Sequence, residues 1–301
     1  MNILKKISDN KIFKKRPIVL MHIGSAGSTF NNWKNIAQNS ILISVDGTSK
    51  DANFKNKFKK TVNSKSIISN KNEKRFFYIT KDSDCSSLLM PNKNILKEWY
   101  FFHRFKIKKK TLIKVISINN FLKKNKINYI DWLIIDAQGV DLKILKSLNK
   151  KILNNISILD LEPGFLEFYQ NADKISDIFK FMSKNFGLED MKFGTNFHLP
   201  SSDVSYFEKK ILFSFNKPSK TYTNITFLNN KKSNERINFM KLIYLFNEDK
   251  IFEARNYLKK NISKSALYEN VKIVIKNKII LKKVRYILLF PFIFLKKIFH
   301  F

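Results

Sequence analysis

The stretch DWLIIDAQGVDLKILK, residues 131–146, restricts the possible folds more than any other part of the chain. Its first half, Trp132 to Ile135, is a short apolar run typical of a strand. The run ends in Asp136, and Gly139 precedes an amphipathic segment, Val140 to Leu148, that predicts a helix. In an open α/β sheet, the carboxyl ends of the strands border the ligand crevice. We therefore expect Asp136 to face a binding site.

Strands and helices alternate along the first two thirds of the chain. A strand, Ile18 to Ile23, leads through a glycine loop into a predicted helix, Thr29 to Gln38, and a second strand, Ile41 to Val45. Further strands are predicted at 66–69, 75–80, 112–117, 156–161 and 206–215, and further helices at 118–124 and 174–185. This order predicts an α/β fold with a mostly parallel sheet and helices on both faces. Residues 94–110 lack a clear period and are expected to be irregular or partly helical.

The two ends of the chain have a different sequence pattern from this α/β region. Residues 1–16 form a basic N-terminal extension, and residues 17–217 are expected to form the main domain. An appendage at 218–280 contains two predicted helices, within 235–262, around a turn at 247–249. Their apolar stripes predict a helical hairpin that packs as an appendage, and a single tetratricopeptide-like unit for protein contact is the alternative.

Residues 281–301 form a basic and aromatic tail. A ten-residue apolar run, Tyr286 to Leu295, lies between basic clusters. It is shorter than the roughly 20 residues that cross a bilayer, but lysines beside aromatic rings suit the surface of an anionic membrane. Docking of this segment on the protein core is the alternative. With no recognisable signal peptide and a single cysteine, Cys85, the chain is expected in the cytoplasm, with peripheral contact at the inner face of the membrane as a further expectation.

The formal net charge of +33 raises the question of a nucleic-acid partner. Only six of the 57 basic residues are Arg, the residue favoured for bidentate recognition of phosphates and bases. Because the lysines are spread along the chain, a compositional bias explains the charge, and no specific nucleic acid is expected. A basic face toward anionic lipid or an acidic glycan is the alternative. The four histidines have no metal-ligand spacing, so no metal site is predicted.

Three strand ends bring similar residues toward the same crevice: HIGSAG at 22–27, VDG at 45–47 and IDAQG at 135–139. Asp46 follows Gly27 by 19 residues, close to the roughly 20-residue separation between a glycine loop and the acid that holds a ribose. The glycine loop lacks the third glycine of a dinucleotide fingerprint. The pattern therefore predicts a nucleoside site without implying a pyrophosphate.

A resemblance to the FkbM-type S-adenosylmethionine-dependent methyltransferases rests on these strand ends and on four further segments: RFFYITKDSDCSSLLMPN at 75–92, VISINNFL at 115–122, DWLIIDAQGVDLKILKSL at 131–148 and ILDLEPGFLEFYQ at 158–170. It covers roughly residues 17–215, and the block 115–170 is its specific part. The resemblance implies a seven-stranded, Rossmann-like methyltransferase sheet and S-adenosylmethionine as cofactor. The implied reaction is O-methylation of a sugar hydroxyl in a bacterial surface glycan or glycolipid.

The resemblance also assigns roles to individual residues. It places the cofactor against His22, Gly24, Ser25, Gly27, Asp46, Ser69, Ser87, Asp136 and Gln138, with Ser86 beside Ser87. Asp46 would hold the ribose, and Ser69 would lie near the adenine. Asp141 completes the family's D-x-[EQ]-G-x-[DE] pattern, although a first-turn helix residue is the simpler explanation for it. Asp136 is the first candidate for the general base or acceptor-orienting group, and Glu162 is the second, because carboxylates suit a hydroxyl donor.

Two departures from the family pattern keep other functions open. His22 stands where the family usually has an acid, and Ile134 stands where it often has a lysine. A non-catalytic protein of the methyltransferase fold, bound to a membrane surface or a glycan-assembly partner, is therefore one alternative. An RNA-binding or RNA-modifying protein is a second, which only the net charge favours. His22 and His103 are outside candidates for proton transfer, and Cys85 is expected to be a buried small side chain.

Overall fold

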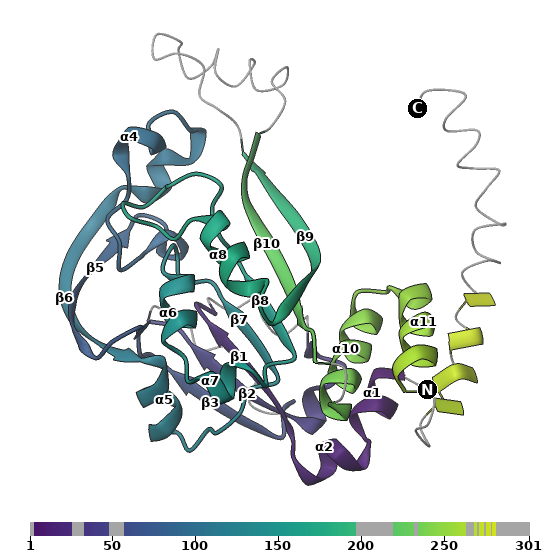
Figure 1. The fold of residues 1–301 in the computed structure, drawn as a ribbon. Coiled ribbons are helices and arrows are strands. Elements are labelled where there is room, and N and C mark those ends of the chain that lie inside the picture. Colours follow the sequence, from purple (N-terminus) through teal and green to yellow (C-terminus); the bar gives the residue numbers. More distant parts are fainter. Residues whose placement is uncertain are drawn as a thin grey trace, which may run out of the picture. The chain divides into compact units, whose positions relative to one another are not determined.

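The computed structural model describes residues 3–25, 33–47, 57–196, 219–231 and 234–262, together with short helical pieces between 268 and 280. The chain divides into two compact units. The larger unit is Ile18–Lys231, and the smaller one combines Met1–Pro17 with Lys232–Phe301. Figure 1 traces the elements of each unit along the chain. Each unit is described by itself below.

A seven-stranded sheet forms the centre of the larger unit, in the order β3-β2-β1-β7-β8-β10-β9 (Figure 1). The strands are β1 Ile18–Ile23, β2 Ser40–Val45, β3 Lys60–Ser64, β7 Trp132–Ile135, β8 Ile158–Leu161, β9 Phe186–Asn196 and β10 Ser219–Asn229. The first five strands of that order run parallel, and β10 runs antiparallel to both β8 and β9. The prediction of a mostly parallel α/β sheet is confirmed.

The order of the strands reverses between β1 and β7. From β1 the chain continues to β2 and β3 on one side, whereas β7 continues to β8 on the other. The backbone N–H of Asp136 donates to the Ile23 carbonyl over 2.9 Å, and that of Gly24 donates to the Val45 carbonyl over 2.9 Å. The ends of β1, β2 and β7 are thus held together at the reversal, which is where open α/β sheets bind ligands.

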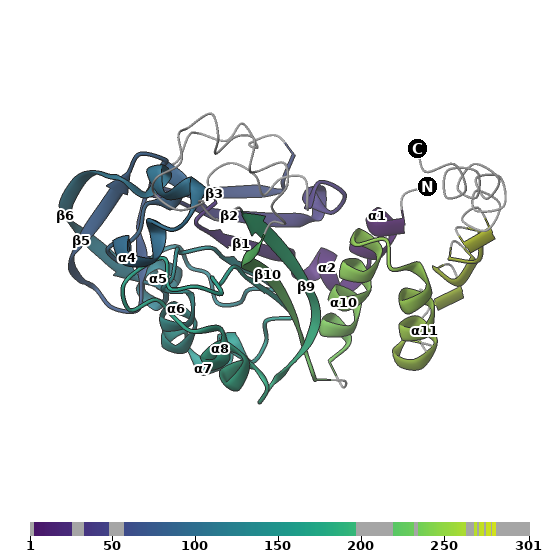
Figure 2. The ribbon, with the colours of Figure 1, turned by 90° about the horizontal axis from the view of Figure 1, so that it is seen from above.

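One face of the sheet packs against helices α5 Ile118–Lys124, α6 Asp141–Ser147 and α8 Ile175–Met182, with the short α7 Lys150–Leu153 beside them (Figure 2). Their buried side chains form a single core with alternate residues of β1, β7 and β8. On the other face Trp33 packs edge-on against Trp132 at 5.8 Å. A helix was predicted there from Thr29 to Gln38. Residues 29–32 lie outside the described residues, Trp33 is helical, and a turn at 34–36 and the 3-10 helix η1, Ala37–Asn39, follow.

A second, three-stranded sheet has the order β4-β6-β5. Its members are β4 Ile68–Ser69, β5 Glu73–Thr80 and β6 Ile107–Ser117, and β5 and β6 pair as a long antiparallel ribbon. β6 begins at Ile107, five residues before the predicted strand, because its lysine-rich first half pairs with β5. Between the two strands lie η2 Ser83–Cys85, α4 Lys93–Leu96 and η3 Tyr100–Phe105.

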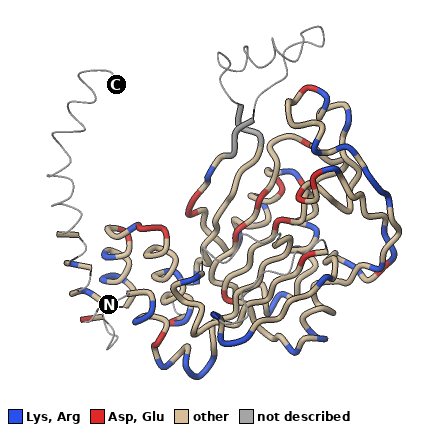
Figure 3. The backbone as a smooth tube through the Cα atoms, turned by 180° about the vertical axis from the view of Figure 1, so that it is seen from behind, with Lys and Arg blue, Asp and Glu red and all other residues tan. Residues whose placement is uncertain are grey.

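Charge is distributed unevenly over the backbone trace (Figure 3). Lysines follow the outer elements, and on the ribbon Lys110 lies over the ring of the exposed Phe76 at 3.9 Å from its centroid. Acidic residues directly follow three of the parallel strands, with Asp46 after β2, Asp136 after β7 and Glu162 after β8. A region rich in carboxyl groups therefore lies inside a chain of strongly positive net charge.

The boundary predicted at residue 217 differs from the structure. β10 lies beyond it and pairs with β8 from Ile225 to Leu228, so the sheet unit extends to Lys231. The late strand predicted at 206–215 lies outside the described residues. No strand was predicted at β10, because its alternating Thr and apolar residues follow Pro218, where the sequence pattern changes and the sheet domain was expected to end.

The smaller unit contains the predicted hairpin, with α10 Glu235–Asn247 and α11 Ile251–Asn261. The residues before Pro17, predicted only as a basic extension, form α1 Ile3–Ser8 and α2 Lys11–Lys15 and belong to the same unit. The Arg236 guanidinium donates to the Arg16 and Pro17 carbonyls, each over 2.8 Å. Among the described residues, no helix has the length and apolar character needed to cross a membrane. The tail at 281–301 lies outside those residues.

Replacing Asp160 by Ala is expected to destabilise the sheet unit. The Asp160 carboxylate accepts hydrogen bonds from Trp132 Nε1 over 2.6 Å and from Thr226 Oγ1 over 2.5 Å, so it links three adjacent strands. Loss of this charged acceptor should lower the free energy of unfolding by about 2 kcal/mol. Urea denaturation would measure the change, with the exposed Glu98→Ala as the control. Equal stability of the two variants would contradict this role.

Candidate active site

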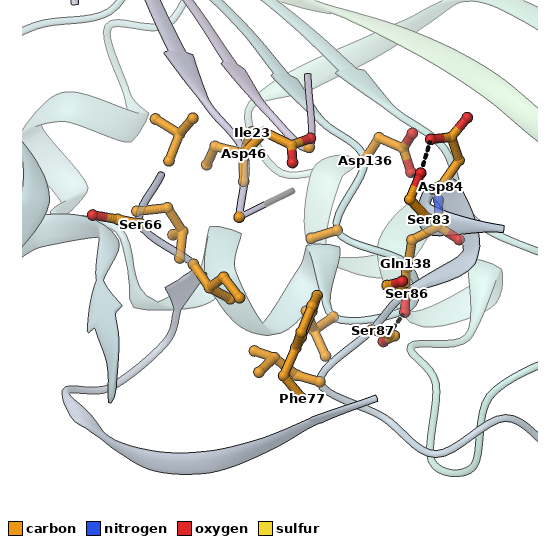
Figure 4. Close-up of a pocket in the computed structure, with 18 residues that line it drawn as sticks. Ile23, Asp46, Ser66, Phe77, Ser83, Asp84, Ser86, Ser87, Asp136 and Gln138 are labelled. Atoms are coloured by element: carbon orange, nitrogen blue, oxygen red, sulfur yellow. Dashed lines mark hydrogen bonds between the residues drawn. The ribbon is translucent and has the colours of Figure 1, made fainter. Parts of the chain in front are cut away.

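A first pocket opens where β1, β2 and β7 end (Figure 4). Its lining comes from the strand ends, the segment after β3, Phe77 of β5, and the loop around η2. The lining residues that had been singled out from sequence are Gly24, Asp46, Ser86, Ser87, Asp136 and Gln138. Figure 4 shows Asp46 and Asp136 at the strand ends and Phe77 across the pocket from them.

Gly24 brings the backbone of β1 unusually close to that of β7. Its φ is +80°, and a Cβ atom placed there would lie 1.9 Å from the backbone oxygen of Asp136. Glycine alone adopts this conformation without strain and leaves room for that oxygen. The floor of the first pocket therefore requires glycine at position 24, because any side chain there would meet the backbone of Asp136.

Asp46 lies at the end of β2 and is 8% exposed. Its backbone N–H donates to the Ser64 carbonyl over 3.0 Å, which fixes the strand end against β3. The pocket lining also includes the apolar side chains of Ile67, Ile68 and Phe77. An acidic group beside an apolar slot suits a nucleoside, since the carboxylate can accept hydrogen bonds from ribose hydroxyls while the base lies against apolar side chains.

The turn after Asp136 positions the residues between β7 and α6. Gln138 and Gly139 both have positive φ, 52° and 94°. The Asp141 carboxylate accepts from the backbone N–H of Ala137 over 2.9 Å and of Gly139 over 3.3 Å, and the Ser87 hydroxyl donates to the Gln138 carbonyl over 2.8 Å. These bonds hold the turn that precedes α6, and Asp141 itself lies in the first turn of that helix.

A second pocket adjoins the first and shares Asp84, Asp136 and Gln138 with it. Its walls combine aromatic rings with carboxyl groups. The aromatic residues are Phe101, Phe105, Phe168, Tyr169 and Tyr222, and the acidic ones are Asp84, Asp136, Asp141, Glu162, Glu167 and Asp173. Among the described residues that line this pocket, Arg104 is the only basic one. Asp136 therefore stands at the junction of the first pocket and an acidic, aromatic one.

Comparison with protein families now adds to this geometry. The family model described as Methyltransferase FkbM domain matches residues 43–191. This chain carries an FkbM methyltransferase domain. No curated protein and no solved structure matches the chain. The matched span of the FkbM domain includes Asp46, both pocket-lining loops, Asp136 and Glu162, whereas Gly24 on β1 precedes it.

The two carboxyl groups singled out for chemistry in the FkbM domain share one environment. Burial raises the pKa of Asp136 well above its usual value, and the neighbouring Glu162 and Asp141 raise it further. The hydrogen bond from Gln138 Nε2 to Asp136 Oδ1, 2.6 Å long, opposes that rise. Burial also raises the pKa of Glu162. Ionisation of one acid therefore hinders ionisation of the other, as expected for neighbouring carboxyl groups.

His22 does not line either pocket of the FkbM domain. It is 6% exposed, and burial lowers its pKa to about 4, although the nearby Asp46 acts in the opposite direction. The ring is therefore neutral at pH 7. A role for His22 as a cofactor contact stays a prediction.

Two other predicted cofactor contacts, Ser25 and Ser69, are absent from the lining of both pockets. The Ser25 hydroxyl is buried and pairs with the Ser44 hydroxyl over 2.7 Å. The Ser69 hydroxyl donates to Asn70 Oδ1 over 3.2 Å, and the preceding residues 66–68 line the pocket instead. Gly27 lies outside the described residues.

The remaining candidates for chemistry lie away from the junction or are held in structural roles. Burial raises the pKa of Cys85 to about 12, so its thiol is not ionised near neutral pH. His103 is exposed, and its Nδ1 lies 3.2 Å from the Tyr100 carbonyl. Burial raises the pKa of Asp141 to about 7. Within the described ranges, no group of three or more His, Cys, Asp or Glu side chains is arranged to hold a metal ion.

Two residues of the second pocket were missed in the sequence. Arg104 donates from Nε to Asp82 over 2.7 Å and reaches the pocket from η3. The Tyr169 hydroxyl donates to Gln138 Oε1 over 2.8 Å. Tyr169 lies within the segment ILDLEPGFLEFYQ, one of the segments that resemble the FkbM family, and this was the only sign in the sequence that it could belong to the site. No periodicity of the sequence indicates which of its side chains face the crevice.

Proposed function

We propose that this FkbM domain is an S-adenosylmethionine-dependent O-methyltransferase that methylates a sugar hydroxyl in a bacterial surface glycan or glycolipid. The observation that carries the proposal is the junction of two different pockets at Asp136. A methyl donor in one and a hydroxyl acceptor in the other would meet there.

The residues of the first pocket fit S-adenosylmethionine. Asp46 is placed to accept hydrogen bonds from the ribose hydroxyls, and Ile67, Ile68 and Phe77 offer an apolar slot for the adenine. Gly24 allows a close approach along the methionine portion, because a Cβ atom there would fill the space against Asp136. The strand order supports the same interpretation, since six parallel strands and one antiparallel strand with a reversal between β1 and β7 match a Rossmann-like methyltransferase sheet.

The chemistry needs little beyond positioning and a proton acceptor. S-adenosylmethionine supplies an electrophilic methyl group, to which the acceptor oxygen bonds while the bond from that methyl to sulfur breaks. Asp136 is placed to orient the acceptor hydroxyl and to take its proton, and Glu162, on the next strand end, is the second candidate. The aromatic walls of the second pocket suit the apolar faces of a sugar ring, and its carboxyl groups suit sugar hydroxyls as donors.

Calorimetric titration of the full chain tests the cofactor directly. S-adenosylmethionine and S-adenosylhomocysteine should each bind saturably at one site, whereas ATP should not, because its phosphates would face Asp84 and Asp136. Failure of both sulfur ligands to bind the folded protein would overturn the enzymatic proposal and favour a non-catalytic binding role. Saturable binding would justify a screen of sugar acceptors with radiolabelled methyl donor.

The affinity for S-adenosylmethionine is expected to rise between pH 5 and pH 8. Because the pKa values of Asp136 and Glu162 are raised above their ordinary values, a larger share of each carboxyl group is neutral at acid pH than in a free acid, and both groups ionise as the pH increases. An ionised carboxylate attracts the sulfonium of S-adenosylmethionine, so the affinity should improve about tenfold. The neutral sulfur of S-adenosylhomocysteine should give a much smaller change. An identical pH dependence of the two ligands would contradict this placement of the sulfonium.

The cellular setting also belongs to the proposal. We place the protein in the cytoplasm, with residues 282–301 in peripheral contact with the anionic inner face of the membrane. Such contact would bring the second pocket to a lipid-linked acceptor. A vesicle sedimentation assay with and without anionic lipid would test this contact separately from cofactor binding.

A further inference from the structure

We propose that Tyr169 is a positioning residue, whose hydroxyl orients the Gln138 amide and thereby holds the Asp136 carboxyl group at the junction of the two pockets. The inference rests on the proposed function, because that function gives Asp136 its role. It assigns a task to an aromatic hydroxyl that reaches the residues at the junction.

Two hydrogen bonds in series connect Tyr169 to Asp136. The Tyr169 hydroxyl lies 2.8 Å from Gln138 Oε1 and 2.9 Å from the Cys85 carbonyl oxygen, both of which are acceptors. Gln138 Nε2 then donates to Asp136 Oδ1 over 2.6 Å. A donor at Oε1 leaves the amide nitrogen directed toward the carboxylate, and it polarises the amide so that the second bond is strengthened.

The position of the Tyr169 hydroxyl is itself fixed. Tyr169 is 5% exposed, and its backbone pairs with that of Pro91 in a single antiparallel β-bridge. The backbone N–H of Gln170 donates to the Met90 carbonyl over 2.9 Å, and that of Asn92 donates to the Phe168 carbonyl over 2.7 Å. Burial raises the pKa of Tyr169 well above its ordinary value, so the phenol stays a donor at every working pH. The relay therefore starts from a rigid and permanently protonated group.

Gln138 is suited to its central place because an amide both accepts and donates. A glutamate at this position could accept from Tyr169, but when ionised it could not donate to Asp136. The backbone of Gln138 is also held in place, since the Ser87 hydroxyl donates to the Gln138 carbonyl over 2.8 Å. The Gln found here, within a pattern that admits Glu or Gln, thus gives Asp136 a neutral donor in place of another negative charge.

The relay should favour the ionised form of Asp136 against the charges around it. The other titratable groups near this carboxyl are Glu162 after β8, Asp141 at the start of α6, Asp46 after β2, Asp84 and Cys85 of η2, and Arg104 of η3. A hydrogen bond to the charged form lowers a carboxyl pKa, so loss of the Tyr169 hydroxyl should raise that of Asp136 by about one unit. The surrounding charges stay the same in a Tyr169→Phe variant.

The test follows the affinity for S-adenosylmethionine between pH 5 and pH 9 in the full chain. In Tyr169→Phe we expect the same affinity at the alkaline end and a midpoint shifted upward by about one pH unit. Gln138→Leu should shift the midpoint at least as far, and the double variant should not shift it further, because both residues act through one path. Tyr78→Phe removes a hydroxyl that lines neither pocket and should leave the curve unchanged.

A purely structural role for Tyr169 would lower the affinity equally at all pH values, and that result, or an unshifted midpoint, would overturn the proposal. If Tyr169→Phe does not fold, Gln138→Glu keeps Tyr169 and should raise the midpoint more strongly, because it replaces the donor by an acid; an unshifted midpoint there would also overturn it. If the wild-type chain binds no S-adenosylmethionine, the proposed function fails. Carbon-13 NMR of labelled Asp carboxyl groups, with Asp136→Asn for assignment, then still decides whether the Tyr169 hydroxyl sets the pKa of Asp136.

Discussion

The Asp46→Ala variant is expected to bind S-adenosylmethionine about 100-fold more weakly than the wild-type chain, because two hydrogen bonds to a charged acceptor contribute about 3 kcal/mol together. Asp46 lies at the end of β2 with its backbone tied to Ser64, and its carboxyl group borders the first pocket. The change removes the acceptor without altering the strand. Calorimetric titration would measure the loss of affinity for both S-adenosylmethionine and S-adenosylhomocysteine, since the two share the ribose.

Two matched variants sharpen this experiment. Asp46→Asn keeps one acceptor oxygen and should fall between Ala and the wild type. Asp177→Ala removes an exposed acid from α8 and should bind normally. An Asp46→Ala protein that is folded and binds both ligands with unchanged affinity would show that the ribose lies elsewhere, and the first pocket would lose its assignment.

The Gly24→Ala variant should lose both stability and cofactor binding. Its backbone has a φ of +80°, and the new Cβ would lie 1.9 Å from the Asp136 backbone oxygen. Left-handed strain and overpacking together should cost about 3 kcal/mol, which corresponds to a fall of about 10 °C in Tm for a unit of this size. Relief of the contact would push β1 from β7 at the floor of the pocket, so saturable binding should disappear as well.

Gly187→Ala is a suitable control for this change. A Cβ at Gly187 meets only the side chain of Asn230, at 3.0 Å, and a side-chain amide can move. Thermal denaturation followed by circular dichroism would compare the two variants. A Gly24→Ala protein with the Tm of the wild type would contradict the close approach of β1 and β7.

Much of the central sheet could be predicted because buried parallel strands are short apolar runs, as in Trp132 to Ile135. The acids at the junction could be predicted for the same reason, since Asp46, Asp136 and Glu162 each follow such a run directly. β10 could not be predicted, because its contacts are with residues distant in the sequence. The acceptor for its Thr226 hydroxyl, for example, is Asp160, which is 66 positions away and is brought close only by the fold.

The second pocket shows where sequence patterns stop being informative. Its walls come from η2, η3 and the residues after β8, which have no repeating period and are held by backbone bonds between loops, such as Gln170 to Met90. Arg104 and Tyr169 reach the pocket only through these contacts. Near Ser69, residues 66–68 line the first pocket, and the placement of Ser69 beside the adenine stays a prediction.

The chain has a net charge of +33, but the lining of its second pocket is acidic. Attraction at long range therefore favours negatively charged ligands, whereas contact inside the pocket disfavours them. An anionic carrier would be drawn toward the lysine-covered exterior, most strongly at low salt. A negatively charged group would then be repelled from the pocket itself, where several carboxyl groups face a single Arg104 among the described lining residues. The acceptor that satisfies both conditions carries its negative charge on a distant part of the molecule and presents an uncharged ring to Asp136.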